Sequence, residues 1–296
     1  MNAEMKSKKR SMIKRKLKLY LPLIKSLQTG LLLVTGVAGY ISARCPVMTW
    51  DTFIGLLGSL FLAVSGSTIL NMVYDRDIDA KMNRTAHRPL PSGKLSVKEA
   101  LFVGLFVSSL GVGWAYMLSP VYSLVVFAGL FIDVVVYTIW LKRRTAWSIV
   151  WGGISGGMPI LAGRVLGTGQ IDALGILFTL SILLWIPTHI LTFSMRYYED
   201  YKKAGVPTFP SQYGYRTTRI IIALSSVGAA IAIGLGAFAL GLSWGYLRLL
   251  SVLAVGIIGL GLISIYKPSE KVNFGLFKYA SLYMLGSMVM MAIGTL

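Results

Sequence analysis

Residues 51 to 79 read DTFIGLLGSLFLAVSGSTILNMVYDRDID, an apolar run that leads directly into a cluster of acidic residues. Residues 52 to 74 contain no charged side chain, and a membrane crossing needs about 20 mostly apolar residues. The acids that follow then lie where such a helix meets the aqueous phase. The stretch therefore predicts a transmembrane helix that ends in a polar, functional segment.

Similar apolar stretches recur along the whole chain of 296 residues. Hydrophobic residues make up 55% of it, charged residues 14%, and the mean hydropathy is +0.69, values typical of a membrane protein. We expect an all-α bundle of about nine transmembrane helices around a central cavity, forming one domain at 20–296 after a basic cytosolic tail at 1–19. The expected helices are residues 20–43, 51–74, 97–118, 121–141, 146–167, 172–196, 218–243, 246–266 and 275–295.

The formal charge of +18 comes from Lys and Arg that lie between the apolar stretches. Membrane topology explains this distribution, so we expect no nucleic-acid partner. With the N-terminus inside, inside segments carry 25 of these cations, and outside ends carry three, at Arg44, Arg164 and Arg248. The positive-inside rule thus predicts a multi-pass protein of the cell membrane with a cytosolic N-terminus and its C-terminus outside.

The remaining composition excludes some alternatives. The single Cys45 rules out an internal disulfide and a cysteine-rich metal site. The basic run from Lys6 to Lys18 precedes an apolar stretch without a small-residue cleavage pattern, so we expect the first helix to be retained. That run should anchor the orientation and touch anionic lipid.

Acidic residues gather in two segments, 75–96 and 197–217, which follow the second and sixth expected helices. Five of the eleven Asp and Glu lie there, and both segments face the cytosol in the expected topology. Asn71, Asp75 and Asp79 are spaced so that a continuing helix would place them on one face. Such carboxylates suit Mg²⁺, which binds one or two protein carboxylates together with water and substrate phosphates.

Cations stand beside these acids, at Lys81, Arg84, His87 and Arg88, and suit a diphosphate. A different interpretation is that the acids solvate a helix end and pair with Arg84 and Arg88. The second segment weighs against it, because residues 196–203 repeat the mixture of acids, bases and phenols. Two facing acidic sites can hold two metal ions on one diphosphate.

These motifs resemble those of a known family. Asn71-x-x-x-Asp75-x-x-x-Asp79 is similar to the first motif of the UbiA superfamily of intramembrane prenyltransferases. The following Arg84-Thr85-x-x-Arg88-Pro89-Leu90 resembles the heme O synthase branch. Four further stretches agree: Lys142 to Thr145, the glycine-rich run Gly152 to Gly163, Trp185-x-Pro187-x-His189, and Asp200-Tyr201-x-x-Ala204-Gly205-Val206-Pro207.

The sequence departs from the family pattern at a few positions. Ser26 follows Lys25 where the family usually has Pro, and Arg164 stands where Trp is common. Ala204 occupies the position at which many superfamily members have a second Asp, as the heme O synthase branch would have it.

The resemblance implies a Mg²⁺-dependent transfer of farnesyl from farnesyl diphosphate to the vinyl group of heme B, which gives heme O. The implied partners are farnesyl diphosphate, heme B, the lipid bilayer and, further on, a downstream heme-modifying enzyme. Chemistry agrees, since diphosphate is a poor leaving group unless metal ions and arginines neutralise its charge. By resemblance, Asp75, Asp79 and Asp200 hold Mg²⁺, and the diphosphate is bound by Lys25, Asn71, Arg84 and Arg88.

Several features keep two interpretations each. His189, which follows Pro187 closely, is either an iron ligand or hydrogen-bonded within the bundle. The glycine-rich run either lets helices approach closely or widens a cavity for a flat porphyrin. The basic residues at 142–144 are topology anchors or partners of heme propionates, with Arg143 the expected heme contact.

Two other functions fit part of the sequence. Another prenyltransferase of the superfamily would act on a quinone precursor or a lipid headgroup, without heme, and would tolerate changes at His189. A transporter would need ionisable groups near the bilayer midplane and interrupted helices around them. The acids instead cluster at helix ends, and Asp133 is the chief exception; at a cost of about 2.5 to 3.5 kcal/mol toward lipid, it should face the bundle interior.

Overall fold

The computed structural model describes residues 16, 18–44 and 49–296, so Cys45 and most of the expected basic tail lie outside the described residues. Every regular element of the described chain is a helix, which confirms the predicted all-α class. The elements are α2 (Ser26–Ser42), α3 (Trp50–Tyr74), α4 (Arg76–Lys81), α5 (Val97–Leu118), α6 (Pro120–Phe131), the π-helix η1 (Ile132–Leu141), α7 (Ser148–Thr168), α8 (Ala173–Arg196), α9 (Tyr198–Ala204), α10 (Phe209–Ala239), α11 (Trp244–Tyr266) and α12 (Glu270–Thr295).

Eight helical segments are long and apolar enough to span a membrane, and α6 together with η1 counts as one of them, Pro120–Leu141. The apolar α2 is shorter, with 17 residues, and adds a ninth apolar helix to these eight in the described part of the chain. The predicted multi-pass bundle of about nine helices is therefore confirmed.

Two predicted helix starts are wrong. The first helix begins at Ser26 instead of residue 20, because Lys25 adopts a left-handed backbone conformation with φ of 45°. The seventh begins at Phe209 instead of residue 218, because Thr208 forms a capping box that starts the helix before the apolar run. Gly214, with φ of 76°, kinks this extension. The remaining ends lie within five residues of the expected ones.

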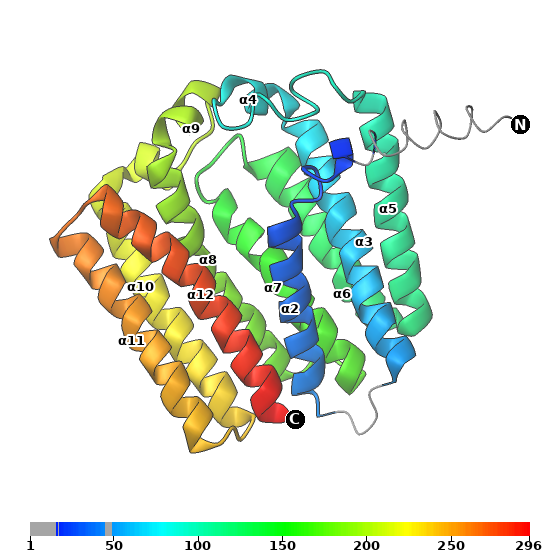
Figure 1. Ribbon diagram of the computed structural model, residues 1–296, viewed down its shortest axis with the longest axis vertical. Helices are drawn as coiled ribbons and strands as arrows, with labels where there is room; N and C mark the ends of the chain where they lie inside the picture. Colours follow the sequence, from blue (N-terminus) through cyan, green and yellow to red (C-terminus); the bar gives the residue numbers. More distant parts are fainter. Residues whose placement is uncertain (1–15, 17, 45–48) are drawn as a thin grey trace, which may run out of the picture.

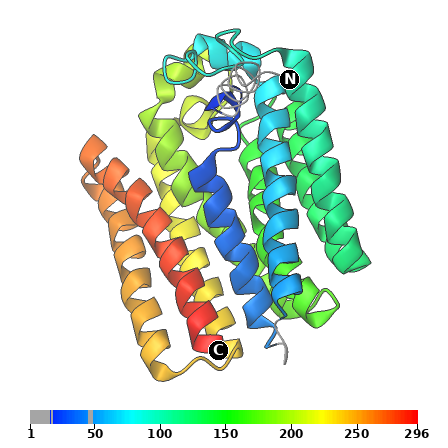
Figure 2. The same ribbon diagram turned by 45° about the vertical axis from the view of Figure 1, so that its right-hand side comes forward.

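The short helices α4 and α9 lie over one end of the bundle, and the C-terminus lies at the opposite end (Figure 1). The turned view shows the same arrangement (Figure 2). Helix α3 packs on α5, α2 on α7, and α8 on α7 and α10, so that α2, α7 and α8 join the two sides of the bundle. Both predicted motif segments therefore meet at one end, as the topology requires.

The glycines of α7 have two kinds of surroundings. A Cβ on Gly163 would lie 1.8 Å from the backbone oxygen of Gly36 in α2, so the two helices touch through their backbones. Gly152 and Gly156, by contrast, line the large cavity described below. Close packing and cavity width thus come from different members of one run.

The unusual Arg164 has a structural role at the end of the bundle away from α4 and α9. Its guanidinium donates to both carboxylate oxygens of Asp172 at 2.6 to 2.9 Å and to the backbone oxygen of Ser42 at 2.8 Å. Asp172 in turn caps α8 by accepting from the N–H of Gly175. These bonds join the ends of α2 and α7 to the start of α8.

Candidate active site

The two acidic segments are joined across the end of the bundle. The backbone N–H of Asn83 donates to Oδ1 of Asp200 at 3.1 Å. Below this bond, α4 and α9 share a small apolar cluster that consists of Ile78, Met82, Ala204 and Val206. The cluster and the hydrogen bond hold the first and second motif face to face, as the sequence predicts.

Asp75 and Asp79 are buried on consecutive turns where α3 passes into α4. Asp75 lies at the junction, and its carbonyl accepts the N–H of Asp79 at 2.8 Å. Asp77 points away, as expected, and its exposed carboxylate binds both terminal nitrogens of Arg143 at 2.6 to 2.7 Å. Hydrogen bonding to Arg143 holds the pKa of Asp77 below its usual range.

Each buried carboxylate has one cationic neighbour. Asp75 Oδ2 pairs with Lys142 Nζ, and Asp79 Oδ2 accepts from Arg88 at 2.9 Å. Burial alone would lower the pKa of Lys142, but Tyr137 and the Asp75 carboxylate outweigh burial and raise it. Oδ1 of Asp75 is buried and has no hydrogen-bond partner among the described residues. Such an oxygen is costly unless a ligand completes it.

Within the described residues, no three His, Cys, Asp or Glu side chains converge on a site made of protein ligands alone. Mg²⁺ usually keeps several waters and binds through one or two carboxylates plus substrate phosphates. The unpartnered oxygen of Asp75 and the carboxylate of Asp79 one turn further offer hard oxygen donors, and Asp200 is joined to the same motif segment through Asn83. The residues present therefore fit a metal ion bound jointly with a diphosphate.

Arg84 is enclosed by aromatic rings from the second motif. Its guanidinium carbon lies 5.0 Å from the centre of the Phe193 ring and 5.4 Å from that of Tyr197. Its NH2 nitrogen also donates to the hydroxyl of Tyr201 at 3.3 Å, and its buried Nε has no partner among the described residues. The aromatic ring set orients a planar cation between the two motif segments.

Lys25 lies just before α2, close to the charged residues around Asp75. Burial lowers its pKa, the positive charges of Lys142 and Arg88 lower it further, and Asp133 and Asp75 act in the opposite direction. A half-buried lysine beside two other cations is an unfavourable arrangement on its own. A diphosphate placed among these cations would relieve it.

Two residues of η1 form hydrogen bonds with the side-chain amide of Asn71. Its Nδ2 donates to Oδ2 of Asp133 at 2.7 Å, and its Oδ1 accepts from Thr138 at 3.0 Å. Ser67, one turn earlier on α3, donates to the same Oδ2 of Asp133 at 2.5 Å. Asp133 thus faces the bundle interior, as expected, and one hydrogen of the Asn71 amide remains for a ligand.

An apolar cavity of about 550 Å³ is lined by residues of α2, α3, α6, η1, α7, α8 and α12, and Asp133, Tyr137 and His189 all border it. His189 lies flat between Trp185 and Phe277, with ring centres 5.1 and 4.5 Å away, and its Nδ1 is 3.3 Å from Ser281 Oγ. The cavity can therefore take a large apolar group and present one histidine to it.

Two residues of the sequence analysis, Arg143 and His87, do not line this cavity. Arg143 is held by Asp77 and by the carbonyl of Tyr74 at 2.7 Å, and it is not among the residues that line the cavity. His87 is exposed in the first motif segment. The assignment of Arg143 as a heme contact stays a prediction.

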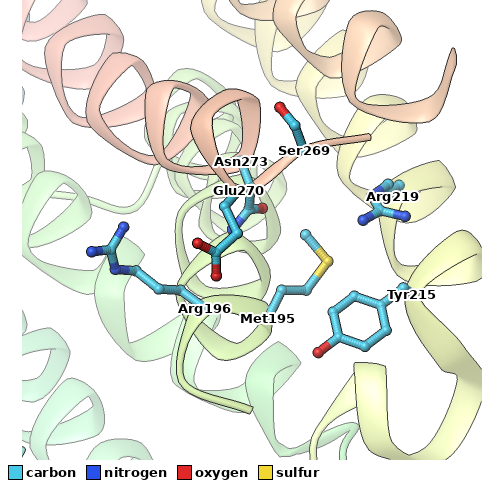
Figure 3. Close-up of a pocket in the computed structure, with 7 residues that line it drawn as sticks. All are labelled: Met195, Arg196, Tyr215, Arg219, Ser269, Glu270 and Asn273. Atoms are coloured by element: carbon cyan, nitrogen blue, oxygen red, sulfur yellow. The ribbon is translucent and has the colours of Figure 1, made fainter. Parts of the chain in front are cut away.

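A second, smaller pocket of about 160 Å³ lies between the ends of α8, α10 and α12 (Figure 3). Its seven lining residues are Met195, Arg196, Tyr215, Arg219, Ser269, Glu270 and Asn273. None of them is a predicted metal, diphosphate or heme ligand, whereas the large cavity is bordered by His189 and by Asp133, the partner of Asn71, so the large cavity is the candidate active site.

Sequence reasoning missed the residues that hold the motifs in place. Ser67 and Thr138 bind Asp133 and Asn71, respectively. For Ser67 the spacing from Asn71 on one helix face was an available signal. For Thr138 there was none, because its partner lies 67 residues away in sequence.

A helical membrane bundle whose carboxylates and arginines cap an apolar cavity defines an intramembrane prenyltransferase. The UbiA prenyltransferase family model matches residues 32–282, and the chain belongs to this family.

Curated relatives are similar over most of the chain. A Pyrobaculum islandicum protein named protoheme IX farnesyltransferase is 36% identical over 88% of this chain and 94% of its own length. An Archaeoglobus fulgidus protein with the same name is 44% identical over 67% of this chain and 70% of its own length.

Solved structures share the fold at low sequence identity. A digeranylgeranylglyceryl phosphate synthase is 21% identical with a TM-score of 0.78, and covers 95% of this chain and 99% of its own. A UbiA homolog from Archaeoglobus fulgidus bound to GPP and Mg²⁺ is 18% identical with a TM-score of 0.69, and covers 92% and 99%.

Proposed function

We propose that this chain transfers the farnesyl group of farnesyl diphosphate to the vinyl group of heme B and so forms heme O, the activity of a protoheme IX farnesyltransferase. The observation that carries the proposal is that the acidic and basic cap connects, through the hydrogen bond from Asn71 to Asp133, to an apolar cavity with His189 in its wall. The names of the curated relatives support heme as the acceptor.

The cap supplies the leaving-group site. Asp75, Asp79 and Asp200 would hold Mg²⁺, which neutralises the charge that develops on the departing diphosphate. The Mg²⁺ and GPP bound to a UbiA homolog support this assignment. Lys25, Arg84, Arg88 and the free amide hydrogen of Asn71 would donate to diphosphate oxygens. These donors come from the start of α2, the end of α3 and the segment after α4.

The cavity supplies the acceptor site. Its walls are mostly aliphatic and aromatic, so water is largely excluded while the allylic cation exists. Ser281 binds Nδ1 of His189, a contact that would leave Nε2 to meet the heme iron. Ionisation at the cap and capture in the cavity are then separated by a short distance along the prenyl chain.

The test is a reconstituted reaction. Purified protein in lipid vesicles is incubated with heme B, farnesyl diphosphate and Mg²⁺, and heme O is sought by mass spectrometry beside a sample without metal. Metal-dependent heme O supports the proposal. Unmodified heme, together with prenylation of a quinone precursor or a lipid headgroup, would show that the acceptor is wrong while the prenyltransferase class stands.

We also propose a cytosolic N-terminus, an outside C-terminus and active-site loops that face the cytosol, since most Lys and Arg lie on that side of the bundle. A cysteine introduced at Ser92 should then react with an impermeant maleimide only from the cytosolic side, and one at Ser243 only from outside. The reverse pattern would overturn this topology. A downstream heme-modifying enzyme remains a predicted partner, because farnesylated heme is too apolar to leave the membrane freely.

A further inference from the structure

Asp133 is a carboxylate inside a membrane-spanning segment, where such groups are costly and usually functional. It lies at the start of η1, and π-helical segments occur frequently at functional sites. Of the described residues that line the large cavity, Asp133 is the one carboxylate. The ionisation chemistry assigned to the cap does not use it.

The two oxygens of this carboxylate have different surroundings. Oδ2 accepts from Ser67 at 2.5 Å and from Asn71 at 2.7 Å, so the side chain is held in one orientation. Oδ1 has no hydrogen bond to any described residue, and it is not fully buried. Asp133 is therefore fixed through one oxygen and accessible from the cavity through the other.

Its depth relative to the cap follows from α3. Asn71 is one helical turn before Asp75, and the Asn71 amide binds Asp133 directly. Asp133 thus lies about one turn deeper than the carboxylates proposed to hold the metal ion. The first carbon of a prenyl chain whose diphosphate is bound at the cap would lie at this depth.

The reaction proposed above needs a proton acceptor here. The terminal vinyl carbon bonds to the first farnesyl carbon as the carbon–oxygen bond to diphosphate breaks, which leaves a cation on the inner vinyl carbon. Water then adds its oxygen to that carbon and must lose one proton. No oxidant or reductant is involved.

We infer that Asp133 orients this water molecule through Oδ1 and accepts its proton. The inference rests on the proposed function and extends it to the hydration step. The other titratable groups at the cavity are less suited, because His189 is sandwiched between two rings and Tyr137 is a poor base at neutral pH.

The experiment measures what kind of adduct forms. Wild-type protein and Asp133→Asn are reconstituted with heme B, farnesyl diphosphate and Mg²⁺ in water enriched in ¹⁸O, and diphosphate release is followed in parallel. We expect wild type to yield the hydrated adduct carrying ¹⁸O. In Asp133→Asn the ratio of hydrated to dehydrated adduct should fall by at least tenfold, with diphosphate still released.

Two further variants separate this role from a purely structural one. Thr138→Val removes the partner of Asn71 Oδ1 but leaves Asp133 untouched, so the product ratio should stay at the wild-type value. Ser67→Ala removes one of the two donors that orient Asp133, so the ratio should fall by less than in Asp133→Asn. Ser67→Ala keeps the inference testable if Asp133→Asn fails to fold.

Three results would overturn the inference. An unchanged or higher hydrated share in Asp133→Asn shows that the carboxylate does not take the proton of water. Loss of diphosphate release in both Asp133→Asn and Thr138→Val shows that Asp133 acts only by positioning Asn71. If wild type forms no heme adduct at all, the proposed function itself is wrong and this step falls with it.

Discussion

The N–H of Asn83 donates to the carboxylate of Asp200 across 117 residues of sequence, at 3.1 Å. Together with the bond from Arg84 to Tyr201, this bond joins the segment after α4 to α9, and it leaves the second oxygen of Asp200 available for a metal ion. The two motifs therefore form one site before any ligand binds.

Asp75→Ala, Asp79→Ala and Asp200→Ala should each abolish prenyl transfer, a loss of at least about 10³-fold, because the charge on the leaving diphosphate is no longer neutralised. The protein should still insert and fold. Activity is measured as Mg²⁺-dependent diphosphate release. Glu199→Ala is the matched control, since this neighbouring acid is exposed, and it should retain activity. Wild-type activity in all three Asp variants would refute the site.

Arg84→Lys should raise the KM for farnesyl diphosphate by roughly tenfold, equivalent to about 1.4 kcal/mol. Lysine lacks the planar guanidinium that lies over the Phe193 and Tyr197 rings and donates to Tyr201. Steady-state kinetics of the variant provide the measurement. Arg76→Lys, at an exposed position in α4, should leave KM unchanged; equal effects of the two substitutions would contradict a special role for Arg84.

The pH dependence should report Lys25. Its pKa is lowered by burial and by the neighbouring cations, so it loses its proton at a pH below the ordinary value of 10.5. Since only the charged form binds diphosphate strongly, kcat/KM for farnesyl diphosphate should fall as pH rises through that lowered pKa. Lys25→Arg stays charged at high pH and should shift the fall upward. Lys81→Arg, at an exposed site, should not shift it; a Lys25→Arg profile identical to wild type would count against this lysine.

Gly163→Ala should lower the free energy of unfolding by about 1–3 kcal/mol. The new methyl group would meet the backbone of Gly36 and force α2 and α7 apart. Thermal unfolding in detergent measures the effect. Gly152→Ala is the control within the same run: its nearest neighbour would be the Tyr137 ring at 3.3 Å, and it borders the cavity. This variant should fold normally and lose activity with heme. Equal unfolding temperatures for both variants would contradict the separate roles.

Much of the fold could be predicted because the apolar segments are long and the bilayer fixes their length. The segment 52–74 has no alternative to a spanning helix, and its end at Tyr74 agrees with the prediction. Helix starts that depend on local backbone geometry could not be predicted in this way. Two helices start at other residues than predicted, because Lys25 has a left-handed conformation and Thr208 forms a capping box.

For the site, the sequence by itself determined which groups are candidates for the chemistry: the spacing of Asn71, Asp75 and Asp79 predicts, from helix periodicity alone, that they share one face. The tertiary structure decided their partners. These partners lie far away in the sequence: Lys142 pairs with Asp75, Thr138 binds Asn71, and the Phe193 ring lies against Arg84. Sequence spacing carries no information about such contacts. Helix packing also decided that Asp133 faces the cavity with one oxygen held and the other accessible, because the direction of a side chain in a bundle depends on which neighbouring helices surround it.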